Sequence, residues 1–146
     1  MYRIRRYALY VPWWNAKLKI IIDVEGEQPS PKQVELLESI VLYDNNLREE
    51  FVKKVFTYYK RDVYGTFVAF GENGEEIQEQ LAPKIKAPDE IWKLLDKPYI
   101  FIPDQSLYRE STFALLFECR WDAEHGFGVL YRNWKIVDIG QQGEMI

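Results

Sequence analysis

The chain has 146 residues, of which 47% are hydrophobic and 16% aromatic, and this composition excludes a disordered chain and suffices for one core without disulfides or structural metals. The net charge of −4 disfavours a protein that holds nucleic acid by its phosphates, and the longest apolar run is far shorter than the ~18 residues that span a bilayer. The single Cys119 excludes an internal disulfide and residues 1–6 lack the apolar segment of a secretory signal, so we expect a cytoplasmic protein.

Two strands are predicted near the N-terminus, because apolar residues alternate in residues 7–11 and again in residues 16–24. Pro12 ends the first strand, and we expect residues 13–15 to connect the two. The charge of this region is one-sided, since residues 1–20 contain basic side chains and no acid. These bases are Arg3, Arg5, Arg6, Lys17 and Lys19.

An amphipathic helix is predicted to begin after Ser30. This residue is a typical N-cap, Pro31 suits the first turn, and Gln33 occupies the capping-box position. Apolar residues then recur at helical spacing, at Val34, Leu37, Ile40 and Val41.

A second amphipathic helix follows a break at residues 44–46. Asn46 and Glu49 predict its cap, and the region around Gly65 ends it. Its apolar stripe consists of Leu47, Phe51, Val55, Phe56 and Tyr59. The stripes of the two helices must bury against a sheet or against each other.

The next part of the chain has a weaker pattern. Residues 66–70 favour a short strand and residues 71–74 a turn, and we expect mobility here. Residues 72–80 predict an acidic loop without a base, whose acids are Glu72, Glu75, Glu76 and Glu79. Residues 87–90 start a short helix that ends at Leu95, with acids at its N-terminal end.

The C-terminal part is predicted to be an antiparallel meander. Its strands cover residues 99–102, 112–121, 127–131 and 134–139, and Asn133 marks a tight hairpin between the last two. We therefore predict one α+β domain over residues 1–146. In it, an antiparallel sheet of N-terminal strands plus the meander packs against two consecutive amphipathic helices and a short third helix.

Side chains suited to chemistry gather at one strand end, in Glu118, Cys119, Asp122, Glu124 and His125. A Cys–His nucleophile needs the two side chains within hydrogen-bond reach, but Cys119 shares a strand face with Phe117 and Trp121. A thiol buried among aromatics is inert. One Cys and one His cannot complete a zinc site, the carboxylates lack a regular calcium loop, and no phosphate-cradling motif occurs. We expect neither catalysis nor a metal or cofactor.

The segment from 117 to 130, followed by Val137-Asp138-Ile139-Gly140, resembles the C-terminal signature of a poorly characterised bacterial domain family. That signature is a strand, Trp-Asp-x-Glu-His-Gly, a second strand, a tight turn and a closing Val-x-x-Gly. This chain departs from it at Arg132-Asn133, where Asn-Gly is typical. Genes of the family often lie beside polymorphic-toxin loci, so the resemblance implies an immunity role, with Asp122 and Glu124 accepting backbone N–H groups in the turn.

The leading hypothesis is an antitoxin-like immunity protein that binds a toxin domain, with no nucleic acid or membrane as partner. Its candidate contacts are Glu72, Glu75, Glu76, Glu79, Asp122, Glu124 and His125. One alternative is a small enzyme or ligand-binding domain that uses Glu118, Asp122, Glu124 and His125 as an acid/base cluster. A subunit of a larger assembly is another, because the chain is rich in aromatic residues.

Overall fold

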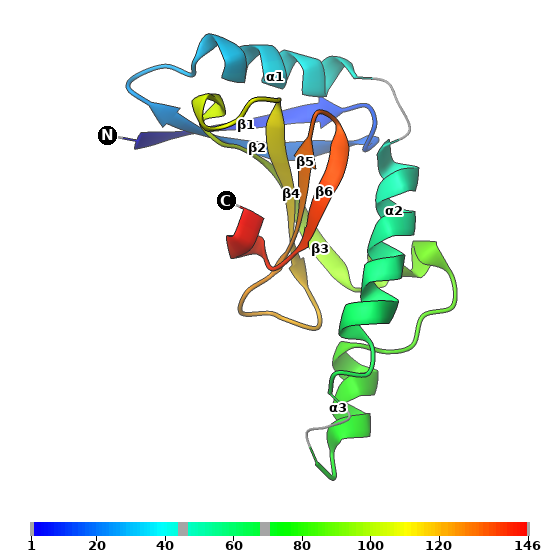
Figure 1. Cartoon of the computed structure of the whole chain (residues 1–146). Coiled ribbons are helices and arrows are strands. Elements are labelled where there is room, and N and C mark those ends of the chain that lie inside the picture. The colour runs from blue at the N-terminus through cyan, green and yellow to red at the C-terminus, as the bar shows by residue number, and fades with distance from the viewer. Residues whose placement is uncertain (1, 44–46, 68–70, 146) are drawn as a thin grey trace.

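The computed structural model describes residues 2–43, 47–67 and 71–145. Of these, residues 2 and 3 are described by their backbone alone. In this part of the chain a six-stranded, open sheet has the strands in chain order (Figure 1). The strands are β1 (Tyr2–Val11), β2 (Ala16–Glu25), β3 (Leu95–Ile102), β4 (Thr112–Cys119), β5 (Phe127–Arg132) and β6 (Lys135–Gly140). Neighbouring strands are antiparallel except β2 and β3, which are parallel.

The helices of the described residues lie mainly in the long connection between β2 and β3, as parallel neighbours require. They are α1 (Pro31–Leu42), α2 (Leu47–Tyr58), the π-helix η1 (Tyr59–Val63), α3 (Gly74–Leu81) and the 3₁₀-helix η3 (Pro88–Lys93). Two further 3₁₀-helices are η4 (Gln105–Leu107), which lies between β3 and β4, and η5 (Gln142–Met145), which follows β6. The predicted α+β class is confirmed.

Local signals placed several elements correctly. The capping box of α1 is present, with Gln33 N donating to Ser30 Oγ and Ser30 N donating to Gln33 Oε1. The β5–β6 hairpin turns at Asn133 and Trp134, which both have positive φ, as a type I′ turn requires. The cap predicted at Asn46 lies outside the described residues.

The predicted apolar stripes of α1 and α2 agree with the observed burial to different degrees. Most of the α2 stripe is buried as predicted, namely Leu47, Phe51, Val55 and Tyr59, with Phe56 half-buried. The α1 stripe was right at Ile40, which is buried, and Leu37 and Val41 are half-buried against the core. It was wrong at Val34, which is 39% exposed, because Gln33 and Leu36 complete the buried face with Ile40. The helix is rotated this way because Gln33 Nε2 reaches two backbone carbonyls under it, those of Asp23 and Pro103.

Most of the acidic loop predicted at residues 72–80 is instead the helix α3, which begins at Gly74, and only Glu72 and Asn73 lie in a turn before it. Thr66 and Phe67 lie in a turn, not in the predicted strand, and residues 68–70 are outside the described part of the chain. Gln78 of α3 is buried and its Oε1 accepts the N–H of Phe67, so a tertiary hydrogen bond anchors the helix. α3 extends from the lower end of the molecule, away from the sheet (Figure 1).

The core between the sheet and the helices is built largely of aromatic rings. Trp13 and Trp14, in the turn between β1 and β2, are both buried. The Trp14 ring lies 5.3 Å from that of Phe51 on α2 and 5.2 Å from that of Trp92 on η3, measured between centroids. Trp13 Nε1 donates to the carbonyl of Ile40 on α1. The turn between the first two strands therefore joins α1, α2 and η3 to the sheet.

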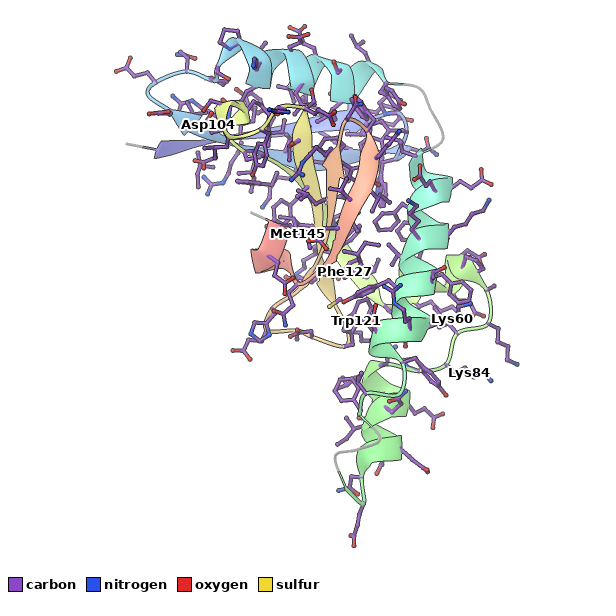
Figure 2. All side chains as sticks on the ribbon, in the orientation of Figure 1. Lys60, Lys84, Asp104, Trp121, Phe127 and Met145 are labelled. Atoms are coloured by element: carbon purple, nitrogen blue, oxygen red, sulfur yellow. The ribbon has the colours of Figure 1, made fainter. Side chains whose placement is uncertain are left out.

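The other face of the sheet is covered only in part. Met145 of η5 packs there against Ala114 and Leu116 of β4, which explains why β4 is buried on both faces. Figure 2 shows Met145 across β4 from α2. The strand predicted at residues 112–121 was too long, because β4 ends at Cys119 and Trp121 lies beyond it.

Candidate functional site

The turn between β4 and β5 is organised by Asp122. Its Oδ1 accepts the N–H of His125 at 3.0 Å and its backbone carbonyl accepts that of Gly126 at 2.9 Å. Its Oδ2 accepts a hydrogen bond from Gln141 Nε2 at 3.2 Å. The expectation that Asp122 accepts a backbone N–H is confirmed, whereas Glu124 is exposed without such a bond in the described structure. Asp122 therefore acts first as the residue that closes the turn.

His125 is tied to the same carboxylate. Its Nδ1 lies 3.0 Å from Asp122 Oδ1, and its carbonyl accepts the N–H of Gln142 in η5. The imidazole is 53% exposed, so the side chain is held at one nitrogen and is open to a partner at the rest of the ring.

Cys119 does not join this pair. Its side chain is buried, and its Sγ donates to the carbonyl of Asp122 at 3.5 Å. Burial raises the pKa of the Cys119 thiol to about 12. A thiol with such a pKa supplies almost no thiolate at neutral pH, so nucleophilic chemistry by Cys119 with His125 is disfavoured.

This thiol makes stability depend on alkaline pH. The unfolded thiol titrates near pH 8.5. Well below that pH the thiol is protonated in both the folded and the unfolded state, so its titration does not change the free energy of unfolding. Above that pH the unfolded chain loses a proton that the folded chain keeps, and stability falls as the pH rises. Relative to Cys119→Ala, the wild type should lose about 2 kcal/mol more between about pH 8 and pH 10, measured by urea unfolding. Parallel pH curves for the two proteins would contradict the assignment.

The four residues of the proposed acid/base cluster are brought together only in part, because three of them share one hollow and Asp122, although bonded to His125, lines another. Glu118, Glu124 and His125 line a surface hollow of about 480 Å³ together with Glu144 of η5. Asp122 lines a different hollow, of about 150 Å³. Glu118 is also engaged by an exposed ion pair, 3.4 Å from Lys97 Nζ. No three His, Cys, Asp or Glu side chains in the described ranges gather closely enough to hold a metal ion.

The other predicted contact residues lie on and before α3. Glu72, Glu75, Glu76 and Glu79 are all exposed. Glu75 and Glu79 line a hollow of about 460 Å³ whose other walls are Tyr64 and the segment Pro83–Lys84. The sequence carried no signal for Tyr64 and Lys84, because tertiary packing alone brings them beside α3.

The β4–β5 turn, with Asp122 and Glu124, lies at the lower end of the sheet, and α3, with its glutamates, extends below that level (Figure 1). We call these two the acidic segments. Figure 2 shows Trp121 at the start of the β4–β5 turn. Its ring lies 5.4 Å from that of Tyr59, the first residue of η1. The Tyr59 hydroxyl in turn donates to the carbonyl of Pro83, just after α3. Residues about 50 positions apart in the sequence therefore share one end of the fold, joined through the buried Tyr59 and the half-buried Trp121.

The comparisons with known proteins place the whole chain in one family. A family model described as a domain of unknown function, DUF6985, matches residues 2–146. No curated protein and no solved structure was found to match the chain. In addition, none of the helices in the described ranges has the length and apolar character needed to cross a bilayer.

Proposed function

The chain belongs to the DUF6985 family, and we propose that it is an immunity protein that neutralises a cognate toxin domain by binding it directly. The observation that carries this proposal is the shared location of the two acidic segments at one end of the fold. A single surface of this kind can contact one partner with both segments. The resemblance of residues 117–130 to a signature encoded near toxin loci points the same way.

The charges of α3 indicate what the partner surface must be like. Glu75, Glu76 and Glu79 are exposed and form no ion pair within the described part of the chain, so their carboxylates are free to meet a partner. The hollow beside Glu75 and Glu79 has room for a lysine or arginine side chain, and Tyr64 offers a ring for its stem. The complementary partner is a basic protein surface, such as a cleft that holds phosphates.

The first test is binding and protection with the product of the neighbouring gene. The purified chain should bind that protein in a pull-down and should restore growth of cells that express it. Absence of both binding and rescue would sink the proposal.

A charge-removal variant tests the surface. Glu75→Gln with Glu79→Gln should slow association with the toxin about tenfold at low salt, because steering between opposite charges raises the on-rate. Glu35→Gln with Glu38→Gln, which removes the same charge from the exposed side of α1 at the far end, should leave the rate unchanged. Both are measured by biolayer interferometry. Equal effects of the two variants would mean that net charge, and not this surface, sets the rate.

The hollow beside the β4–β5 turn favours a second candidate, a small ligand-binding domain or enzyme. Glu124 and His125 are exposed there and could orient a cationic or hydrogen-bonding molecule. This candidate predicts ligand-dependent shifts of the His125 ring signals in a nuclear magnetic resonance screen, with no shifts at α3. Shifts at both segments on addition of the toxin support the immunity role instead.

A further inference from the structure

The outer face of the β1–β2 hairpin, opposite the helices, carries an exposed cationic patch. The register pairs Arg6 with Ile21, Ala8 with Lys19 and Tyr10 with Lys17, so all these side chains share one face. Arg6, Lys17 and Lys19 are exposed, as is Tyr10 at 55%. We call Arg6, Lys17 and Lys19 the basic patch.

The basic patch is not neutralised within the molecule. None of its three side chains forms an ion pair in the described ranges. The nearest specific contact is that of Lys19 Nζ, which lies 5.4 Å from the ring centroid of Tyr99 on β3. Of the acids on the same face, Glu25 lies at the far end of β2, and Asp23 lies diagonal to Arg6 in the register without forming an ion pair with it in the described structure. Three cations beside an exposed tyrosine are thus left to an anionic partner.

We propose that this patch docks α3 of a second copy of the chain. The complementary charges are present in the same molecule, since the acids of α3 are equally unpaired. The spacings also agree: Lys17 and Lys19 are two residues apart on a strand, about 7 Å, and Glu75 and Glu79 are four residues apart on a helix, about 6 Å. Because α3 extends from the end of the fold remote from β1, it meets the basic patch of another copy (Figure 1).

The resulting contact is head-to-tail. A symmetric alternative would pair the free edges of two β1 strands, but it would bring the arginines at positions 5 and 6 of both copies together, which like-charge repulsion opposes. A head-to-tail contact uses two different surfaces of each copy and produces either a closed ring or an open filament. The isolated chain should therefore associate weakly, in proportion to its concentration, and less at high salt.

Charge reversal on each surface, followed by mixing, tests this contact. Lys17→Glu with Lys19→Glu places acids on the patch, and Glu75→Lys with Glu79→Lys places bases on α3. Each variant alone should sediment as a monomer at about 0.05 M NaCl, where the wild type associates. An equimolar mixture of the two should associate again, because both contacts are then complementary. At about 0.5 M NaCl the wild type should be monomeric as well.

The matched control is Lys53→Glu with Lys54→Glu, which makes the same change in net charge on exposed positions of α2. It should associate like the wild type. A wild type that is monomeric at both salt concentrations overturns the proposal, as does equal loss of association in the control. Binding of an oligothymidylate to the patch, with no self-association, would also overturn it in favour of nucleic acid. All measurements use the isolated chain, so their outcome is independent of whether a toxin binds.

Discussion

Trp14→Ala is expected to destabilise the protein by about 3 to 5 kcal/mol, the usual cost of deleting a large buried ring. Trp14 is 5% exposed, and its ring contacts Phe51, Trp92 and Phe117, which belong to α2, η3 and β4. Arg48 adds a cation above the ring and donates to the Trp14 carbonyl. Removing the indole leaves a cavity at the point where helices and sheet meet, and the surrounding rings cannot collapse to fill it.

Urea unfolding followed by circular dichroism measures this change, provided that the slope of the transition is the same in both proteins. The control is Trp14→Phe, which keeps a ring in the site and should cost clearly less than the alanine variant. A loss below about 1 kcal/mol for Trp14→Ala would show that the cluster is not the centre of the core.

Gly126→Ala is expected to destabilise the protein by about 2 to 3 kcal/mol. Gly126 has a φ of 68°, a conformation that costs a residue with a side chain about 1 to 2 kcal/mol. An added Cβ would also lie 2.8 Å from the Phe117 carbonyl oxygen, and this backbone atom cannot move aside cheaply. The variant therefore strains the turn that Asp122 closes.

Gly143→Ala serves as the matched control. Gly143 lies in η5 close to the same turn, has no positive φ, and has open space where its Cβ would be. It should change the stability by less than about 0.5 kcal/mol. Comparable thermal unfolding of the two variants would contradict the conformational role assigned to Gly126.

The signature segment, residues 117–130, contains residues with two different roles. Asp122 and Gly126 shape the turn through hydrogen bonds and a left-handed backbone, and Trp121 packs against Tyr59. Glu124 and His125 are exposed at its tip. The segment thus combines residues that build the turn with residues that the turn presents, and only the latter are candidates for contact with a partner.

The sequence by itself determined the elements whose signals are local. The α2 stripe follows from apolar residues at helical spacing, which one packed face requires. The capping box at Ser30 and the hairpin at Asn133 depend on bonds between residues a few positions apart. Alternation in residues 16–24 predicted β2 for the same reason, since a strand with one buried face repeats every two residues.

Tertiary structure decided the features that depend on residues distant in the chain. Gln33 is buried on α1 because two carbonyls below it need donors, and Gln78 anchors α3 by accepting the Phe67 N–H. The parallel pairing of β2 with β3 joins strands separated by about 70 residues. The same packing separates Cys119 from His125 and gathers the acids of α3 and the β4–β5 turn at one end. No local pattern encodes these arrangements, because their free energy comes from burial and hydrogen bonds that exist only after the chain has folded.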